Sequence, residues 1–218
     1  MHSFIRITLC SVVFVWVSVA FPVFAEVLRF VDSSGAYLEG VVVFQTDSEV
    51  EARLDNDAHV MDQVQRQFLP DLLLIAAGDT VSFPNSDSIR HHVYSFSTAR
   101  SFDLELYGNS ETPTLDFPSA GLVVVGCNIH DDMIGYIVVS ANGEFLRSNI
   151  DGELELPSDL AKAGWYVWHP WMATAGYAPV ALVDISSAHP HRFEIQAPEA
   201  RAQSDLESRF RRRLQRGN

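Results

Sequence analysis

The sequence predicts an all-β protein, a sandwich or barrel followed by a smaller β domain. Short runs of β-branched and aromatic residues recur along the chain at intervals of about eight to twelve residues. Clusters of Gly, Asp, Ser and Pro separate these runs, and long amphipathic helical patterns are absent from the body of the chain. This combination is typical of β-sandwiches and β-barrels.

Residues 1–25 have the layout of a secretory signal peptide. A short polar start precedes an apolar run over residues 7–21, and Ala25 supplies the small residue at the end. A retained membrane anchor is the alternative, although the run falls slightly short of the roughly 20 apolar residues that span a bilayer. We expect cleavage after Ala25 and export to the periplasm.

The exported chain is acidic. Removing Arg6 from the 15 basic residues leaves 14 of them against 28 acidic ones, a net charge of −14. Residues 199–218 carry six Arg against three acidic residues, which leaves −17 on residues 26–198. An acidic body argues against nucleic acid as a partner, because its phosphates require positive charge. The same charge favours approach of a basic protein.

Strand-like segments follow one another over residues 26–140, the predicted first domain. They cover residues 27–31, 41–44, 72–75, 80–83, 91–96, 101–106, 113–117, 121–126 and 134–139. Residues 45–60 are polar and acidic, which predicts a loop or a weak strand. Residues 63–68 have no clear period and are compatible with a short helix.

A second, smaller β domain is predicted over residues 141–197. Asn142-Gly143 and Asp151-Gly152 favour tight turns, because both dipeptides tolerate positive φ. Strand patterns follow over residues 164–168 and 180–185, and a weaker one over 191–195.

The basic tail, residues 198–218, changes character. Leu206, Phe210 and Leu214 recur at four-residue spacing within a charged run, as in an amphipathic helix. Such a helix would suit a membrane surface or a partner protein, and a solvated tail is the alternative.

A soft metal-binding motif lies between the last two predicted strands of the first domain. Cys127, His130 and Met133 place a thiol, an imidazole and a thioether within seven residues. These donors suit copper better than magnesium or calcium. A further imidazole comes from the neighbouring predicted strand, in which adjacent residues face opposite sides. Only one of His91 and His92 should therefore reach the metal.

Cys127 is the only cysteine in the chain after the signal, because Cys10 lies within it. No intramolecular disulfide can then form. A lone thiol in an oxidising compartment is a liability unless it is buried or bound. A buried inert cysteine is the alternative, but the closeness of His130 and Met133 favours a metal ligand.

These segments resemble the cupredoxins, the small blue copper proteins. The matching residues are Asn85, six positions before His91, the apolar Val93, and residues 126–133. The short Cys-x-x-His-x-x-Met loop looks most like that of amicyanin, whereas plastocyanin-like members have a longer gap before the methionine. The wider stretch over residues 61–131 is similar to exported bacterial proteins labelled methylamine utilisation proteins.

The resemblance implies a Greek-key β-sandwich that binds one copper ion. His91, Cys127 and His130 would be the equatorial ligands and Met133 the weak axial one. The resemblance and the strand alternation together favour His91 over His92 as the ligand.

Three further side chains are expected around the ligands. Cupredoxins often have Asn at the position of His92, which we expect near the site and exposed. Asn85 is expected to brace the copper loop by hydrogen bonding, a plain turn residue being the alternative. Asn128 follows the thiol directly and belongs to the same surroundings.

The second domain resembles transthyretin-like or carboxypeptidase-regulatory-like modules. The residues that carry this likeness lie at 150–154, 156–157 and 164–167. Such modules are usually non-catalytic, so the resemblance gives the second domain no reaction of its own.

The motif and the export signal predict a periplasmic one-electron carrier that serves a protein redox partner, a dehydrogenase or a cytochrome. An enzyme of the copper oxidase or reductase class would need a further catalytic copper. His169, His189 and His191 lack thiol or carboxylate neighbours in the sequence and are expected at the surface or in packing. A copper-binding or copper-delivery protein, and a structural β protein with a vestigial site, are alternatives that use the same residues.

Overall fold

The computed structural model describes residues 26–46, 57–157, 160, 163–176, 178–184 and 192–197. The predicted signal peptide, the basic tail and the pair His189 and His191 lie outside these residues. Within them, no helix is long and apolar enough to cross a membrane. The described chain is all-β, as predicted, apart from short helical segments such as α1 (Pro170–Thr174).

Among the described residues, twelve strands lie within 26–140 and five more follow. They are β1 (Glu26–Asp32), β2 (Val42–Gln45), β3 (Ala58–Val60), β4 (Asp62–Val64), β5 (Gln67–Leu69), β6 (Leu72–Ala76), β7 (Thr80–Ser82), β8 (His91–Phe96), β9 (Ser101–Tyr107), β10 (Thr114–Asp116), β11 (Gly121–Cys127), β12 (Ile134–Ser140), β13 (Phe145–Arg147), β14 (Glu153–Leu156), β15 (Trp165–Trp168), β16 (Val180–Ala181) and β17 (Arg192–Ile195).

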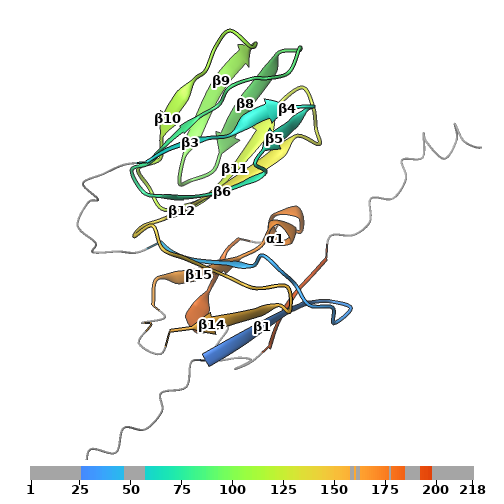
Figure 1. The fold of residues 1–218 in the computed structure, drawn as a ribbon, viewed down its shortest axis with the longest axis vertical. Coiled ribbons are helices and arrows are strands. Elements are labelled where there is room, and N and C mark those ends of the chain that lie inside the picture. Colours follow the sequence, from blue (N-terminus) through green and yellow to red (C-terminus); the bar gives the residue numbers. More distant parts are fainter. Residues whose placement is uncertain are drawn as a thin grey trace, which may run out of the picture.

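The upper unit in Figure 1 is a sandwich of two sheets. One sheet has the strand order β6-β12-β11-β8-β9, and the other has the order β10-β7-β3. Their inward side chains share one core, because successive residues of a strand alternate between the two faces. This core includes Val81, Phe83, Val93, Phe117, Val123 and Ile137, all fully buried.

The lower unit takes its strands from both ends of the described part of the chain. β1 pairs with β14 and β17, and β2 pairs with β13 and β15. The structure thus differs from the division expected from the sequence, which grouped residues 26–45 with the first domain. Local pattern identifies a strand but not its partner, and the hydrogen-bonded partners of β1 and β2 lie more than 100 residues further along the chain.

The two units pack against each other through the outer face of the five-stranded sheet. Val138 of that sheet belongs to the core of the lower unit, and Leu72, Leu122 and Tyr136 pack against it. The rings of Tyr136 and Trp168 have centroids 5.0 Å apart. The half of the sheet made by β6 and β12 is therefore covered, and β8 and β9 lie on the side away from the lower unit (Figure 1).

Residues 62–69 form a β-hairpin, not the short helix with which the pattern was compatible. β4 and β5 pair antiparallel around Gln65 and Arg66, whose φ angles are 53° and 60°. Two consecutive left-handed residues form the tight turn that matches the twist of a hairpin. The sequence carries no Asn-Gly or Asp-Gly signal at this turn, so the hairpin could not be read from it.

Candidate metal centre

The candidate centre lies where two adjacent strands of the five-stranded sheet meet one loop. His91 opens β8, Cys127 closes β11, and Cys127 is the registered partner of Val93. The loop from Cys127 to β12 carries His130 and Met133. Strand pairing and loop length thus bring the two predicted segments together.

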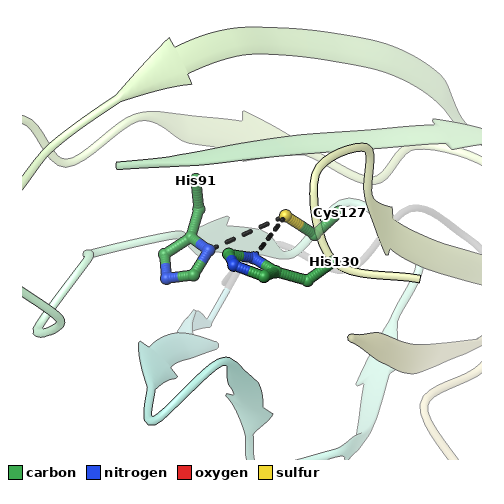
Figure 2. A group of neighbouring side chains, drawn as sticks. All are labelled: His91, Cys127 and His130. Carbon is green, nitrogen blue, oxygen red and sulfur yellow. Dashed lines mark hydrogen bonds between the residues drawn. The ribbon is translucent and has the colours of Figure 1, made fainter. Parts of the chain in front are cut away.

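Three potential ligands converge on one point, as Figure 2 shows. The Cys127 sulfur lies 3.7 Å from Nδ1 of His91 and 3.6 Å from Nδ1 of His130. The donor atoms of these three residues all lie within 4.8 Å of one another. A metal ion bonded to nitrogen and sulfur at about 2.0–2.3 Å needs donors roughly 3–4 Å apart. The arrangement fits a metal ion with little rearrangement.

The chemistry of the cluster also points to a cation. A thiol has one proton and can satisfy only one of two imidazole acceptors. His91 is fully buried and Cys127 is 5% exposed, so solvent offers these side chains little compensation. Three converging Lewis bases, two of them buried, are stabilised by a metal ion with a preference for nitrogen and sulfur.

The loop that carries His130 and Met133 is closed by its own backbone. The amide of Cys127 donates to the carbonyl of Met133 (3.1 Å), and the amide of Met133 donates to that of His130 (3.0 Å). Met133 is 1% exposed and lines surface hollows together with Cys127 and with His130. The predicted fourth ligand therefore lies near Cys127 and His130, and its axial role stays a prediction.

The structure places His91, and not His92, beside the thiol. Strand alternation points the His91 side chain into the sandwich and the His92 side chain to the outer face, where 20% of it is exposed. Nε2 of His92 contacts Oδ1 of Asp103 at 2.6 Å. His92 is thus a surface neighbour of the centre.

Asp87 supports His91 and was not singled out from the sequence. Its Oδ2 lies 2.8 Å from Nε2 of His91, which leaves Nδ1 of that ring directed at Cys127. Such carboxylate contacts fix the tautomer and orientation of histidine ligands. The sequence offered one signal for this contact, a carboxylate four residues before the histidine. It was not recognised because the carboxylate lies in a polar segment that predicts a turn.

The carboxylate of Asp87 is in turn held by the β4–β5 hairpin. Backbone amides of Gln65 and Arg66 donate to its two oxygens at 2.6 and 2.8 Å. Burial opposes ionisation of the carboxyl group, but the bonds from Arg66, His91 and Gln65 together hold its pKa below its ordinary value. Asp87 is therefore an anion behind His91.

Asn85 braces the histidine side of the centre. Its Nδ2 donates to the carbonyls of Ile89 (2.9 Å) and Tyr107 (3.2 Å), and its Oδ1 accepts the amide of Asp87 (3.0 Å). These bonds fix the segment that leads into His91, whereas the sequence suggested that Asn85 would brace the loop after Cys127. The difference arises because Asn85 turns into its own loop, as Asn side chains often do.

A buried polar network lies behind this segment. Nε2 of Gln63 donates to the Tyr107 hydroxyl (2.6 Å), which donates to the carbonyl of Phe83 (2.7 Å). Tyr107 is the registered partner of His91. Burial raises the pKa of the Tyr107 phenol, so it stays protonated and keeps donating.

The remaining predicted residues lie at the rim. Asn128 is exposed, and its amide donates to the carbonyl of His92 (3.2 Å), which ties the loop to β8. Asp131 and Asp132, in the loop between His130 and Met133, are also exposed.

Comparison with known proteins gives likenesses of fold only. No family model and no curated protein matches the chain. Among solved structures, it is similar to a copper-containing nitrite reductase from Thermus scotoductus SA-01, with 25% identity over 44% of this chain and TM-score 0.36. The chain spans 25% of the length of that reductase.

Two further solved structures show the same degree of likeness. A purple cupredoxin from Nitrosopumilus maritimus is 22% identical over 38% of this chain and 100% of its own, with TM-score 0.34. A reduced amicyanin variant is 23% identical over 45% of this chain and 91% of its own, with TM-score 0.36. Each likeness covers less than half of this chain, so the function is argued from the site.

Proposed function

We propose that this chain is an exported copper protein that holds one copper ion and carries single electrons between protein redox partners. The observation that carries the proposal is the convergence of the buried His91 and Cys127 with the half-buried His130, in a loop that also carries Met133. Two imidazoles, one thiolate and a weak thioether are the donor set of electron-transfer copper sites. Bound copper would supply the chemistry by alternating between Cu(I) and Cu(II).

The chain's own residues would hold the ion and keep its surroundings fixed. Cys127 ends a paired strand and His91 begins its neighbour, so both are anchored by the sheet. Asp87 and the hairpin behind it hold the imidazole of His91 in one orientation. A rigid ligand set favours fast electron transfer, because little needs to move when the charge of the ion changes.

Export is part of the proposal and follows from the sequence. The chain begins with a signal-like segment, and Cys127 is the only cysteine among residues 26–218. A periplasmic location would oblige a lone thiol to be protected. The buried position of Cys127 between two imidazoles meets that requirement.

The decisive experiment is an absorption and EPR spectrum of the protein after Cu(II) is added. We expect an intense visible band from thiolate-to-copper charge transfer and a reversible one-electron couple in voltammetry. Cys127→Ser should remove the band. Ser95→Ala, on the neighbouring strand β8, should keep it. Tight copper binding without a reversible couple would instead support copper delivery, and a colourless complex would refute the proposed site.

A further inference from the structure

One half of the outer face of the five-stranded sheet is left open by the described residues. The lower unit covers the half formed by β6 and β12. β8 and β9 lie at the other edge, away from that unit (Figure 1). We name this open region the β8–β9 face; it consists of His92, Tyr94, Phe96, Asp103, Glu105 and Leu106, with Asn128 and Ile129 at the end nearest the metal centre.

An aromatic strip runs along this face. The outward residues of β8 are His92, Tyr94 and Phe96, whose rings follow each other with centroid distances of 5.7 and 5.2 Å. Phe96 is 83% exposed, and Ile129 at the other end is 51% exposed. Exposed apolar groups that adjoin one another on a folded surface are typical of protein-binding sites.

Acidic side chains line the hollow beside the strip. The hollow has a volume of about 310 Å³ and is lined by His92, Asp103, Glu105, Leu106, Asn128 and Ile129. No Arg or Lys is among these lining residues, and 59% of the Asp103 side chain is exposed. A hollow with apolar walls and carboxylates suits the aliphatic stem and charged end of a lysine or arginine.

The face adjoins the proposed metal ligands directly. Asn128 and Ile129 follow Cys127 in the chain, and the Tyr94 ring lies against Gly126, where a Cβ would meet it at 3.1 Å. A protein seated on this face would therefore lie on the outer side of the two strands, β8 and β11, whose inner side carries His91 and Cys127. The net charge of −17 over residues 26–198 would also guide a basic protein toward it.

We propose that the β8–β9 face is the docking surface for a basic redox protein, whose lysine or arginine enters the hollow while its apolar surface covers Phe96. This inference rests on the proposed electron-carrier function and names the chemistry of the partner. An anionic lipid surface would be repelled by Asp103 and Glu105, so the partner is a protein.

The test measures binding of a basic c-type cytochrome of high isoelectric point to the copper-loaded protein by calorimetry at low ionic strength. We expect Glu105→Lys to weaken binding about fivefold or more, and added salt to weaken it in the wild type. Phe96→Ala should weaken binding without changing its salt dependence. Glu155→Lys and Ile150→Ala are the matched controls, because both residues are exposed in the lower unit.

A second measurement separates this inference from the proposed function. Electron exchange with ferricyanide, a small oxidant that needs no docking surface, should be equal in all five proteins at high ionic strength, where the changes of charge are screened. Normal exchange together with equal cytochrome binding by Glu105→Lys and Glu155→Lys would overturn the docking surface and leave the electron carrier standing. Site-dependent binding with no electron exchange would overturn the carrier and support the face as a binding surface.

Discussion

Two adjacent histidines each contact a carboxylate, and only one of them faces the thiol. Nε2 of His91 lies 2.8 Å from Asp87, and Nε2 of His92 lies 2.6 Å from Asp103. The alternation of β8 sends the first imidazole to Cys127 and the second to the surface. Replacing Asp87 or Asp103 removes one negative charge in either case, but only Asp87 contacts the histidine that faces Cys127. The two variants therefore separate the effect of that contact from the effect of a nearby charge.

We predict that Asp87→Asn raises the reduction potential of the copper-loaded protein. The carboxylate stabilises the more positive Cu(II) state through His91, and an amide at this position would do so less. A charge-assisted hydrogen bond exceeds a neutral one by about 1 kcal/mol, which is about 40 mV for one electron. Voltammetry measures the shift. Asp103→Asn removes the same charge beside His92 and should shift the potential less; equal shifts would contradict the role of the contact.

A second pair of variants tests which histidine binds the ion. His91→Ala should abolish the visible copper band and weaken copper binding in competition with a chelator, because a buried ligand is lost. His92→Ala should keep both properties, since its side chain lies on the outer face. Loss of the band in His92→Ala alone would show that the ligand assignment is wrong.

At the scale of elements, tight turns fix how strands enter their sheets. Gly152 precedes β14 with φ of 69°, and its carbonyl accepts the amide of Phe30 at 2.8 Å. A Cβ at Gly152 would lie 2.3 Å from the Phe30 carbonyl oxygen, whereas one at Gly176, with φ of 77°, would meet nothing within 4 Å. The two glycines share the same backbone constraint and differ in the space around them.

Gly152→Ala should therefore lower the free energy of unfolding by about 2–4 kcal/mol, because backbone must move to admit the methyl group. Gly176→Ala should lower the free energy of unfolding by about 1 kcal/mol, because only the left-handed backbone conformation of the new residue is unfavourable. Urea denaturation of both variants gives the comparison. A cost at Gly152 no greater than that at Gly176 would mean that β1 and the turn do not approach as closely as described.

His169 connects pH with the stability of the element that follows it. Its Nδ1 accepts the amide of Trp171 at the start of α1 (3.3 Å), and burial lowers the pKa of the imidazole from 6.5 to about 4. The unfolded imidazole takes up a proton near pH 6.5 and the folded one only near pH 4, so stability is lost as pH falls through this window.

We expect this loss to reach about 2 kcal/mol at pH 5 relative to pH 7. His169→Asn keeps a side-chain acceptor at the start of the helix and removes the titrating group. Urea denaturation at both pH values should show a smaller difference in that variant. An identical pH dependence in the two proteins would place its origin elsewhere.

On the scale of the whole molecule, the lower unit is assembled from both ends of the described chain. β1 and β2 find their partners in β14, β17, β13 and β15, while the sandwich with the metal centre is formed by residues between them. The two units share an apolar contact through Tyr136 and Trp168. The stability of the sandwich that carries the candidate metal centre is thereby coupled to strands outside it.

Truncation tests this arrangement. A chain of residues 26–140 keeps β1 and β2 but removes their partners, and unpaired strand edges promote aggregation. We expect it to aggregate more than a chain of residues 57–140, which lacks those strands as well. Light scattering after refolding measures the difference. Equal behaviour of the two chains would show that β1 and β2 need no partner after residue 140.

Much of the sandwich could be predicted, because its strands carry their own pattern. β8, β11 and β12 lie close to the expected residues. Alternation predicted that only one of His91 and His92 faces the centre, and the resemblance favoured His91. The β4–β5 hairpin was missed because Gln65 and Arg66 are not turn formers by residue type. The partners of β1 and β2 were missed because no local sequence pattern indicates which distant strand a strand pairs with.

The sequence by itself determined the types of potential ligand, the loop that holds three of them and the all-β class, because donor chemistry and strand periodicity are properties of short segments. Only the tertiary structure decided that His91 meets Cys127 across two paired strands, that Asp87 stands behind it, and that one half of the sheet face stays open. These features depend on which strands become neighbours. Which strands become neighbours depends on the burial of both cores together, so it cannot be predicted from any single segment.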